Sequence, residues 1–127
     1  PAPVPAPAAV SWAEAEVLAA RHGAVFVDAR PAGAFQAGAI PGAVSLPYGE
    51  LAAGIATFQR RYAADTWLIV YCGDTDCGLS TACAQALMQD YGYRRVVYLP
   101  GGYTEWQRHR ATQPEPPPSE SALGCGL

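Results

Sequence analysis

Short apolar runs alternate with longer amphipathic segments along most of this chain. Four runs are apolar enough to be buried on both faces of a strand, and we predict strands at 25–28, 43–46, 67–71 and 95–99. The intervening patterns predict helices over 12–22, 50–62, 79–90 and 103–110. Buried strands that alternate with helices indicate an α/β fold, in which a central parallel sheet has helices on both faces.

The first predicted helix carries sequence signals at both of its ends. Ser11 is followed three residues later by Glu14, which is the pattern of a capping box. Gly23 follows Arg21 and His22, and a glycine in that place commonly ends a helix. The helix should therefore begin at about Trp12 and end at about His22.

The two ends of the chain differ in composition from the part between them. Residues 1–10, PAPVPAPAAV, predict an extended linker rich in proline and alanine. Residues 113–127, QPEPPPSESALGCGL, contain few large apolar groups and predict a flexible tail. One folded domain should thus occupy 11–112. Because the chain begins at Pro1, we take it as processed, trimmed or cut from a longer protein, and its compartment stays open.

Composition and charge exclude some classes of function. With 127 residues, half of them hydrophobic, the chain is long enough for one compact domain. Its net charge of −3 argues against a nucleic-acid partner, because phosphate backbones attract clustered positive charge. No segment approaches the roughly 20 apolar residues that cross a bilayer, so we expect no membrane span in this chain.

The stretch LIVYCGDTDCGL holds the candidate chemistry. Cys72 follows the strand at 67–71 directly, and ligands of open α/β sheets bind at the carboxyl ends of strands. The next helix should point its positive dipole end at the same loop and stabilise a thiolate there. Gly73 and Gly78 permit the backbone turns of an anion-binding cradle. We therefore interpret Cys72 as a nucleophile at the base of an anion site.

Several separated motifs, in order, resemble the rhodanese family. They are VDARPAGAFQAGAIPGAVSLPYGEL, then IVYC with its loop and helix, then VVYLPGGYTEW. The resemblance covers essentially the whole unit from Ser11 to about Thr112. The resemblance implies a sheet of about five parallel strands. It also implies a sulfurtransferase whose cysteine accepts sulfane sulfur as a persulfide and passes it to a thiophilic acceptor.

Family roles can be assigned to individual positions through these motifs. The resemblance places the nucleophile at Cys72 and an Asp-x-Arg pair at Asp28 and Arg30. Gly101, Gly102 and Trp106 match an element that borders the pocket, and with Asp28 we interpret them as structural support. The predicted substrate-binding residues are Arg30 and the loop residues Gly73, Asp74, Thr75, Asp76, Gly78 and Leu79.

The loop departs from the pattern that the resemblance implies. It is longer by two residues than a common active loop of the family, lacks a basic residue, and contains Asp74 and Asp76. Two carboxylates repel a thiosulfate dianion, so we expect poor thiosulfate activity. Phosphatase relatives use Cys-x5-Arg, but that arginine position is Gly78 here, which argues against phosphoryl transfer. Where relatives often carry a histidine in GHIPGA, this chain has Ala39, which says little about chemistry.

Cys77 leaves two interpretations open. It could approach Cys72 for a disulfide, and so resolve a persulfide or form a redox pair, or it could pack as a small hydrophobic side chain. Cys83 should lie on the apolar face of its helix, and Cys125 in the tail. Since Cys83, His22 and His109 have no suitable spacing, we expect no zinc site, no other metal and no cofactor.

Two classes of function follow from these observations. The first is a sulfurtransferase or thiol-redox domain that works through Cys72, with or without Cys77, on a small sulfur donor and a small thiol or protein thiol acceptor. The second is a non-catalytic rhodanese-like binding or regulatory module, in which the acidic loop is a recognition surface. Fast alkylation of Cys72 at neutral pH would favour the first class.

Overall fold

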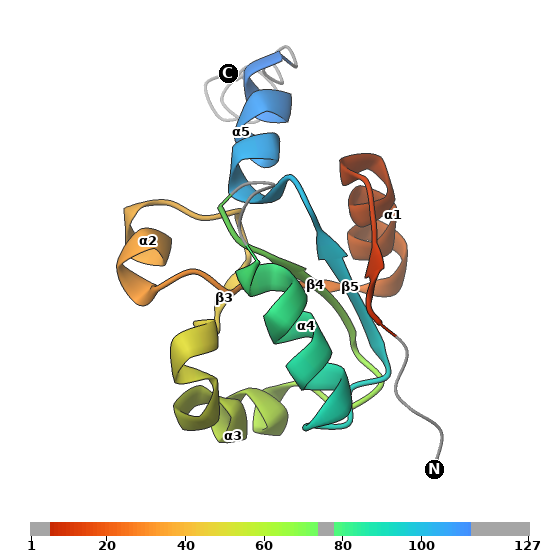
Figure 1. Ribbon diagram of the computed structural model, residues 1–127. Helices are drawn as coiled ribbons and strands as arrows, with labels where there is room; N and C mark the ends of the chain where they lie inside the picture. Colours follow the sequence, from red (N-terminus) through yellow and green to blue (C-terminus); the bar gives the residue numbers. More distant parts are fainter. Residues whose placement is uncertain (1–5, 74–77, 113–127) are drawn as a thin grey trace, which may run out of the picture.

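A five-stranded parallel sheet forms the centre of the molecule (Figure 1). The computed structural model of the chain describes residues 6–73 and 78–112. The strand order is β1-β5-β4-β2-β3, so β4 is the middle strand. The strands are β1 (Ala8–Ala9), β2 (Val25–Asp28), β3 (Val44–Ser45), β4 (Trp67–Tyr71) and β5 (Arg95–Leu99). The predicted α/β class with a parallel sheet of about five strands is confirmed.

Five α-helices connect and follow these strands within the described ranges. They are α1 (Trp12–His22), α2 (Ala32–Ala37), α3 (Leu51–Arg61), α4 (Leu79–Gln89) and α5 (Gly102–Thr112), and a 3₁₀ turn, η1 (Tyr48–Glu50), precedes α3. The four helices that the sequence predicts correspond to α1, α3, α4 and α5. None of the helices in 6–73 and 78–112 is long and apolar enough to cross a bilayer.

The ends of α1 confirm the signals in its sequence. The Ser11 hydroxyl accepts a hydrogen bond from the Glu14 amide at 3.1 Å, and the Glu14 carboxylate accepts one from the Ser11 amide at 2.8 Å. Gly23 ends the helix with φ of 64°, a left-handed conformation that favours glycine. Both ends are therefore determined by local chemistry.

Alternate residues of β4 enter two separate apolar cores. Leu68 and Val70 pack with side chains of α3 and α4, whereas Ile69 and Tyr71 pack with Trp12 of α1 and with part of α5. Figure 1 shows the same layers, with α3 and α4 on one side of the sheet and α1 on the other. Because both faces of β4 are covered, its apolar run lacks the polar alternation of a half-exposed strand.

Two elements have little signal in the sequence. Ala8 and Ala9 pair with Val97 and Tyr98 as β1, inside the segment that we expected to be a linker. No proline occupies these two positions, so both amides can take part in an edge strand. The six-residue helix α2 begins after Pro31 and is too short for a clear periodic pattern.

Candidate active site

Cys72 lies at the carboxyl end of the middle strand, directly after β4. Its exposed fraction is only 1%, and its sulfur is part of a disulfide whose second cysteine lies outside the described residues. Helix α4 begins at Leu79, after Gly78 as its N-cap, at the other end of the candidate loop. The strand-end position of Cys72 is therefore as predicted, and the stabilisation of its thiolate by the dipole of α4 stays a prediction.

The start of α5 holds the backbone at Cys72. The Tyr103 amide donates to the Cys72 carbonyl at 2.8 Å, and the Thr104 amide donates to the Gly73 carbonyl at 2.9 Å. Gly102 has φ of 60°, and a Cβ at this position would overlap the Cys72 carbonyl oxygen. A glycine is thus required here for two reasons, and α5 fixes the point where the candidate loop leaves the sheet.

Asp28 and Arg30 form a buried ion pair beside this loop. Asp28 is fully buried, and the Arg30 side chain is 13% exposed. The Arg30 Nη2 donates to Asp28 Oδ2 at 2.7 Å and to the Gly38 carbonyl at 2.7 Å, and its Nε donates to Asp28 Oδ1 at 3.0 Å. These bonds to Asp28 raise the pKa of Arg30, so the guanidinium is charged and held within the fold.

Two tyrosines complete the surroundings of the guanidinium. Its carbon lies 4.4 Å from the ring centre of Tyr103 and 5.9 Å from that of Tyr71, which are distances for cation–π contacts. The Tyr71 hydroxyl accepts a hydrogen bond from the Ile40 amide at 3.1 Å, and burial raises the pKa of Tyr71. Arg30 therefore links β2, the segment at Gly38, the end of β4 and the start of α5.

A hollow of about 610 Å³ opens beside the carboxyl ends of β2 and β3. Its walls are mostly small or apolar, and Glu50 is the one charged side chain among the described residues that line it. The full lining is Ala29, Pro31, Ala32, Gly33, Pro47, Gly49, Glu50 and Leu79. A volume in this range suits a ligand larger than a small inorganic anion.

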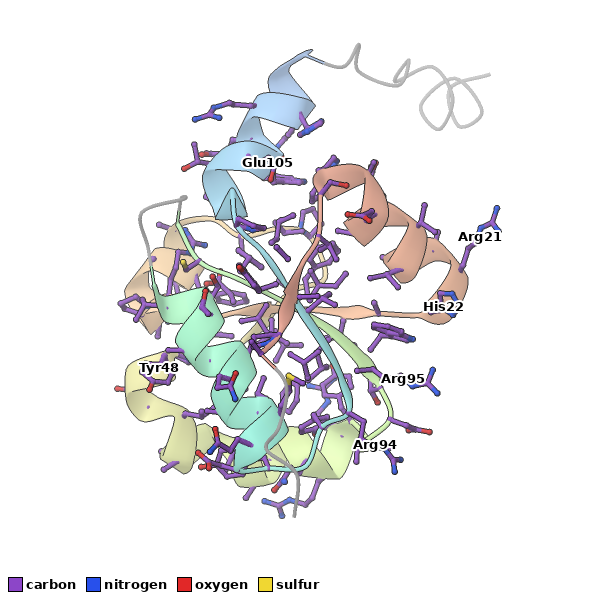
Figure 2. All side chains as sticks on the ribbon, turned by 45° about the vertical axis from the view of Figure 1, so that its right-hand side comes forward. Arg21, His22, Tyr48, Arg94, Arg95 and Glu105 are labelled. Atoms are coloured by element: carbon purple, nitrogen blue, oxygen red, sulfur yellow. The ribbon has the colours of Figure 1, made fainter. Side chains whose placement is uncertain are left out.

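Four basic residues lie at the opposite end of the sheet. Figure 2 shows Arg21 and His22 at the end of α1 and Arg94 and Arg95 at the start of β5, well away from Glu105 on α5. The guanidinium carbon of Arg95 lies there 5.8 Å from the centre of the Trp67 ring. The side chains of these four residues are consequently remote from the strand end that carries Cys72.

The structure brings several of the predicted site residues together. Cys72, Gly73, Gly102 and the Asp28–Arg30 pair meet at one end of the sheet, and Leu79 lines the hollow there. Trp106 stacks on Tyr103 with ring centres 5.4 Å apart, and the Glu105 amide donates a hydrogen bond to the Gly101 carbonyl at 3.1 Å. Asp74, Thr75, Asp76, Cys77 and Cys125 lie outside the described residues.

Cys83 is a core thiol, as its position on the helix predicts. It is fully buried and free, and burial raises its pKa to about 12. In the part of the chain that the structure describes, no group of three or more His, Cys, Asp or Glu side chains is arranged to hold a metal ion.

Sequence reasoning missed three residues of this site. Tyr103 and Gly38 contact Arg30, and Glu50 lines the hollow. Tyr103 follows a Gly-Gly pair, which is a weak signal for a loop near a pocket, and Gly38 and Glu50 have no local signal. Their roles depend on contacts between segments that are far apart in the sequence.

The fold and this arrangement define a single-domain α/β protein with a cysteine at the end of the middle strand. The sequence profile of the rhodanese-like domain matches residues 11–109. This match covers well over half of the chain, and the chain belongs to the rhodanese family. The resemblance that its motifs carry is confirmed.

Three individual proteins show which members of the family this chain is similar to. Thiosulfate sulfurtransferase GlpE of Pseudoalteromonas translucida is 30% identical over 98 residues, which are 77% of this chain and 87% of that protein. The HTH-type transcriptional regulator Rv0324 of Mycobacterium tuberculosis is 34% identical over 95 residues, which are 73% of this chain but only 39% of the regulator. The structure of the human single-domain sulfurtransferase TSTD1 has a TM-score of 0.64 at 30% identity, covering 82% of this chain and 97% of that one. The chain therefore has distant homology to sulfurtransferases.

Proposed function

We propose that this domain passes sulfane sulfur through a persulfide on Cys72, which Cys77 resolves. The position of Cys72 carries the proposal, because the nucleophile follows the middle strand and its carbonyl is held by the start of α5. Homology to sulfurtransferases supports the reaction class.

The redox state of Cys72 and the spacing of the cysteines in the sequence support Cys77 as the resolving residue, because the sulfur of Cys72 is part of a disulfide. The chain has four cysteines, and Cys83 is free, which leaves Cys77 and Cys125 as candidates to resolve a persulfide on Cys72. Cys77 is five residues away in sequence, whereas more than fifty residues separate Cys72 from Cys125. A short loop closes with a smaller loss of chain entropy than a long one, which favours Cys77.

The proposed cycle consists of four balanced reactions. The Cys72 thiolate attacks the outer sulfur of an organic persulfide, forms Cys72–S–SH, and releases the donor as a thiolate. An external thiol can then take the outer sulfur. In the absence of such an acceptor, the Cys77 thiolate attacks Cys72 Sγ, forms the disulfide, and releases hydrosulfide. A dithiol reductant returns the pair to two thiols and is itself oxidised.

Mass spectrometry of intact protein tests this cycle. The reduced chain is treated with a small alkyl persulfide, and hydrosulfide release is measured in parallel. Wild type should release hydrosulfide and form the disulfide, whereas Cys77→Ser should accumulate one added sulfur atom on Cys72. Cys125→Ser is the matched control and should behave as wild type. Sulfur uptake by Cys72→Ser would show that Cys72 is not the nucleophile.

The same samples test a non-catalytic function. Cys72 is almost fully buried, which would suit a module that binds a partner without chemistry. After reduction, iodoacetamide should nevertheless label Cys72 faster than Cys83 at neutral pH, because burial raises the pKa of Cys83 to about 12. If reduced Cys72 neither alkylates nor accepts sulfur, the binding module is the better proposal.

A further inference from the structure

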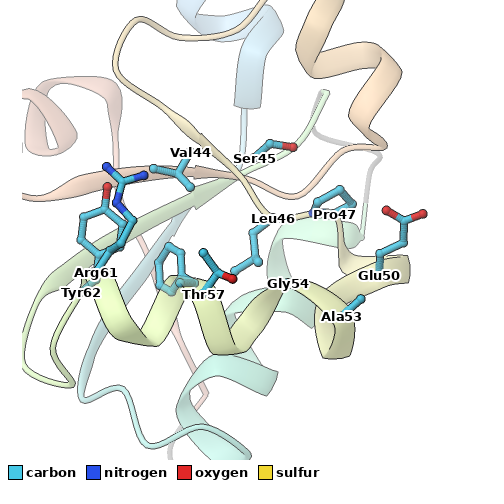
Figure 3. Close-up of a pocket in the computed structure, with 11 residues that line it drawn as sticks. Val44, Ser45, Leu46, Pro47, Glu50, Ala53, Gly54, Thr57, Arg61 and Tyr62 are labelled. Atoms are coloured by element: carbon cyan, nitrogen blue, oxygen red, sulfur yellow. The ribbon is translucent and has the colours of Figure 1, made fainter.

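A second hollow continues the one beside the candidate active site. It has a volume of about 340 Å³ and lies between β3 and α3, as Figure 3 shows. Pro47 and Glu50 line both hollows. The two hollows are thus adjacent, and together they form a track that runs from Leu79, at the start of α4, to Arg61 at the end of α3. We call it the edge track.

The edge track lies along an edge strand of the sheet. In the described part of the chain β3 pairs only with β2 and is last in the strand order. The Leu46 amide bonds to the Asp28 carbonyl of β2 at 2.9 Å. Since successive residues of a strand direct their hydrogen-bonding groups to opposite sides, the amide and carbonyl of Ser45 face away from β2, toward the track. An added strand could pair with them.

The floor and the two ends of the edge track differ in character. Leu46 and Phe58 are buried beneath it and provide an apolar floor. Gly54 has no side chain to fill the space, and a Cβ there would lie 3.2 Å from Leu46. Arg61 and Glu50 stand at opposite ends of the second hollow in Figure 3, and both are exposed.

We propose that the edge track binds an extended segment of a partner protein and presents the cysteine of that segment to Cys72. The proposal rests on the proposed function, because the partner cysteine would be the sulfur acceptor. Its segment would carry a basic side chain against Glu50 and an acidic side chain against Arg61. Antiparallel pairing is somewhat more stable per residue than parallel pairing, so we expect the segment to run opposite to β3. Its cysteine then comes first, in the hollow beside the candidate active site, and the rest of the segment runs toward Arg61.

The length of α3 sets the spacing of the two charges. From Glu50 to Arg61, helix α3 rises by about 16 Å at about 1.5 Å per residue. An extended strand covers that length in about five residues at about 3.3 Å each. The basic and acidic residues of the partner segment should therefore be about five positions apart, with the cysteine preceding the basic residue.

Peptide binding tests the surface without any sulfur chemistry. The probe is fluorescein-labelled acetyl-SAKTVTVD-amide, in which serine replaces the cysteine, and binding to the full reduced chain is measured by fluorescence polarisation. Glu50→Arg and Arg61→Glu should each weaken binding by about fivefold, as for exposed ion pairs. The double variant should instead prefer acetyl-SAETVTVR-amide. Glu16→Arg and Arg21→Glu, which change exposed charges on α1, should leave binding unchanged.

Two modified probes test the strand pairing itself. N-methylation at two adjacent central positions should give unequal results, because only one of the two amides faces β3 in an added strand. The reversed peptide acetyl-DVTVTKAS-amide should bind more weakly than the forward one. Equal effects of both methylations, equal binding of both directions, or no response to either charge reversal would overturn the proposal.

Sulfur transfer distinguishes this proposal from the proposed function. Acetyl-CAKTVTVD-amide should accept sulfur from the Cys72 persulfide with a higher kcat/KM than 2-mercaptoethanol, and Arg61→Glu, which lies outside the hollow beside the candidate active site, should lower only the value for the peptide. Equal loss for both acceptors would overturn the edge track. If the serine peptide binds as expected but neither thiol receives sulfur, the surface stands and the proposed function fails.

Discussion

Replacing Gly102 by alanine should disturb Cys72 through the backbone alone. At φ of 60°, a residue with a Cβ is strained by about 1–2 kcal/mol. The new Cβ would also overlap the Cys72 carbonyl oxygen. Relief of this overlap moves α5 away and weakens two hydrogen bonds, from Tyr103 to Cys72 and from Thr104 to Gly73. At about 1 kcal/mol each, these bonds bring the total loss of stability to about 3–4 kcal/mol.

Gly23 provides a matched control for this substitution. Its φ of 64° is nearly the same, but a Cβ there has nothing within 4 Å. Gly23→Ala should therefore suffer only the backbone strain of about 1–2 kcal/mol. The difference between the two variants, about 2 kcal/mol, isolates the contact with Cys72.

Urea unfolding and alkylation kinetics measure the two consequences. Gly102→Ala should unfold at lower urea than Gly23→Ala and should change the iodoacetamide rate of reduced Cys72 while the chain is still folded. Gly23→Ala should leave that rate as in wild type. Equal stability losses together with equal alkylation rates would refute the argument that α5 positions Cys72.

Three further predictions concern charge and ionisation. Arg30→Gln should lower the free energy of unfolding by about 3 kcal/mol, because it leaves Asp28 buried without its charge partner, whereas Arg21→Gln on the surface should change it by less than about 0.5 kcal/mol in the same urea titration. The double substitution Asp74→Asn and Asp76→Asn should raise kcat/KM for thiosulfate by about tenfold per 1.4 kcal/mol of repulsion removed. The kcat/KM for an uncharged donor should stay nearly constant. Unchanged thiosulfate kinetics would show that the two acids point away from the pocket. Because burial raises the pKa of Cys83 to about 12, its contribution to stability is complete below the ordinary value of 9.0 and is lost as the pH rises toward about 12, so the decline in unfolding free energy above pH 9 should be less steep in Cys83→Ala than in wild type.

Patterns within one segment of the sequence were enough to predict most of the fold. The apolar run at 67–71 identifies a doubly buried strand, and Ser11 with Glu14 identifies the start of α1. Helix α2 was not predicted because its six residues contain less than two helical turns of pattern. Strand β1 was not predicted because two alanines form a strand only when they can pair with a neighbouring strand, which here is β5.

The candidate site was less predictable because its contacts join distant segments. Cys72 and the Asp28–Arg30 pair could be assigned through motifs, but the stacking of Tyr103 on Arg30 depends on how α5 meets the end of β4. Glu50 lines both hollows because Pro47 and the start of α3 lie where the two hollows meet. No local pattern in the sequence predicts contacts between segments that are so far apart in the chain.

The bonds of Arg30 bear on which sulfur donor the site can accept. Arg30 is a charged group at the same end of the sheet as Cys72, and its guanidinium contacts the ring of Tyr71, the residue before Cys72. Its Nε and Nη2 already donate to Asp28 and Gly38, and its face is covered by Tyr103. An anion that drew the guanidinium away from Asp28 would leave this buried carboxylate without its charge partner, at a cost of several kcal/mol, which exceeds what one exposed contact to an anion returns. With Glu50 as the charged group on the described wall of the hollow, an uncharged or cationic sulfur compound is the better match to this end of the sheet.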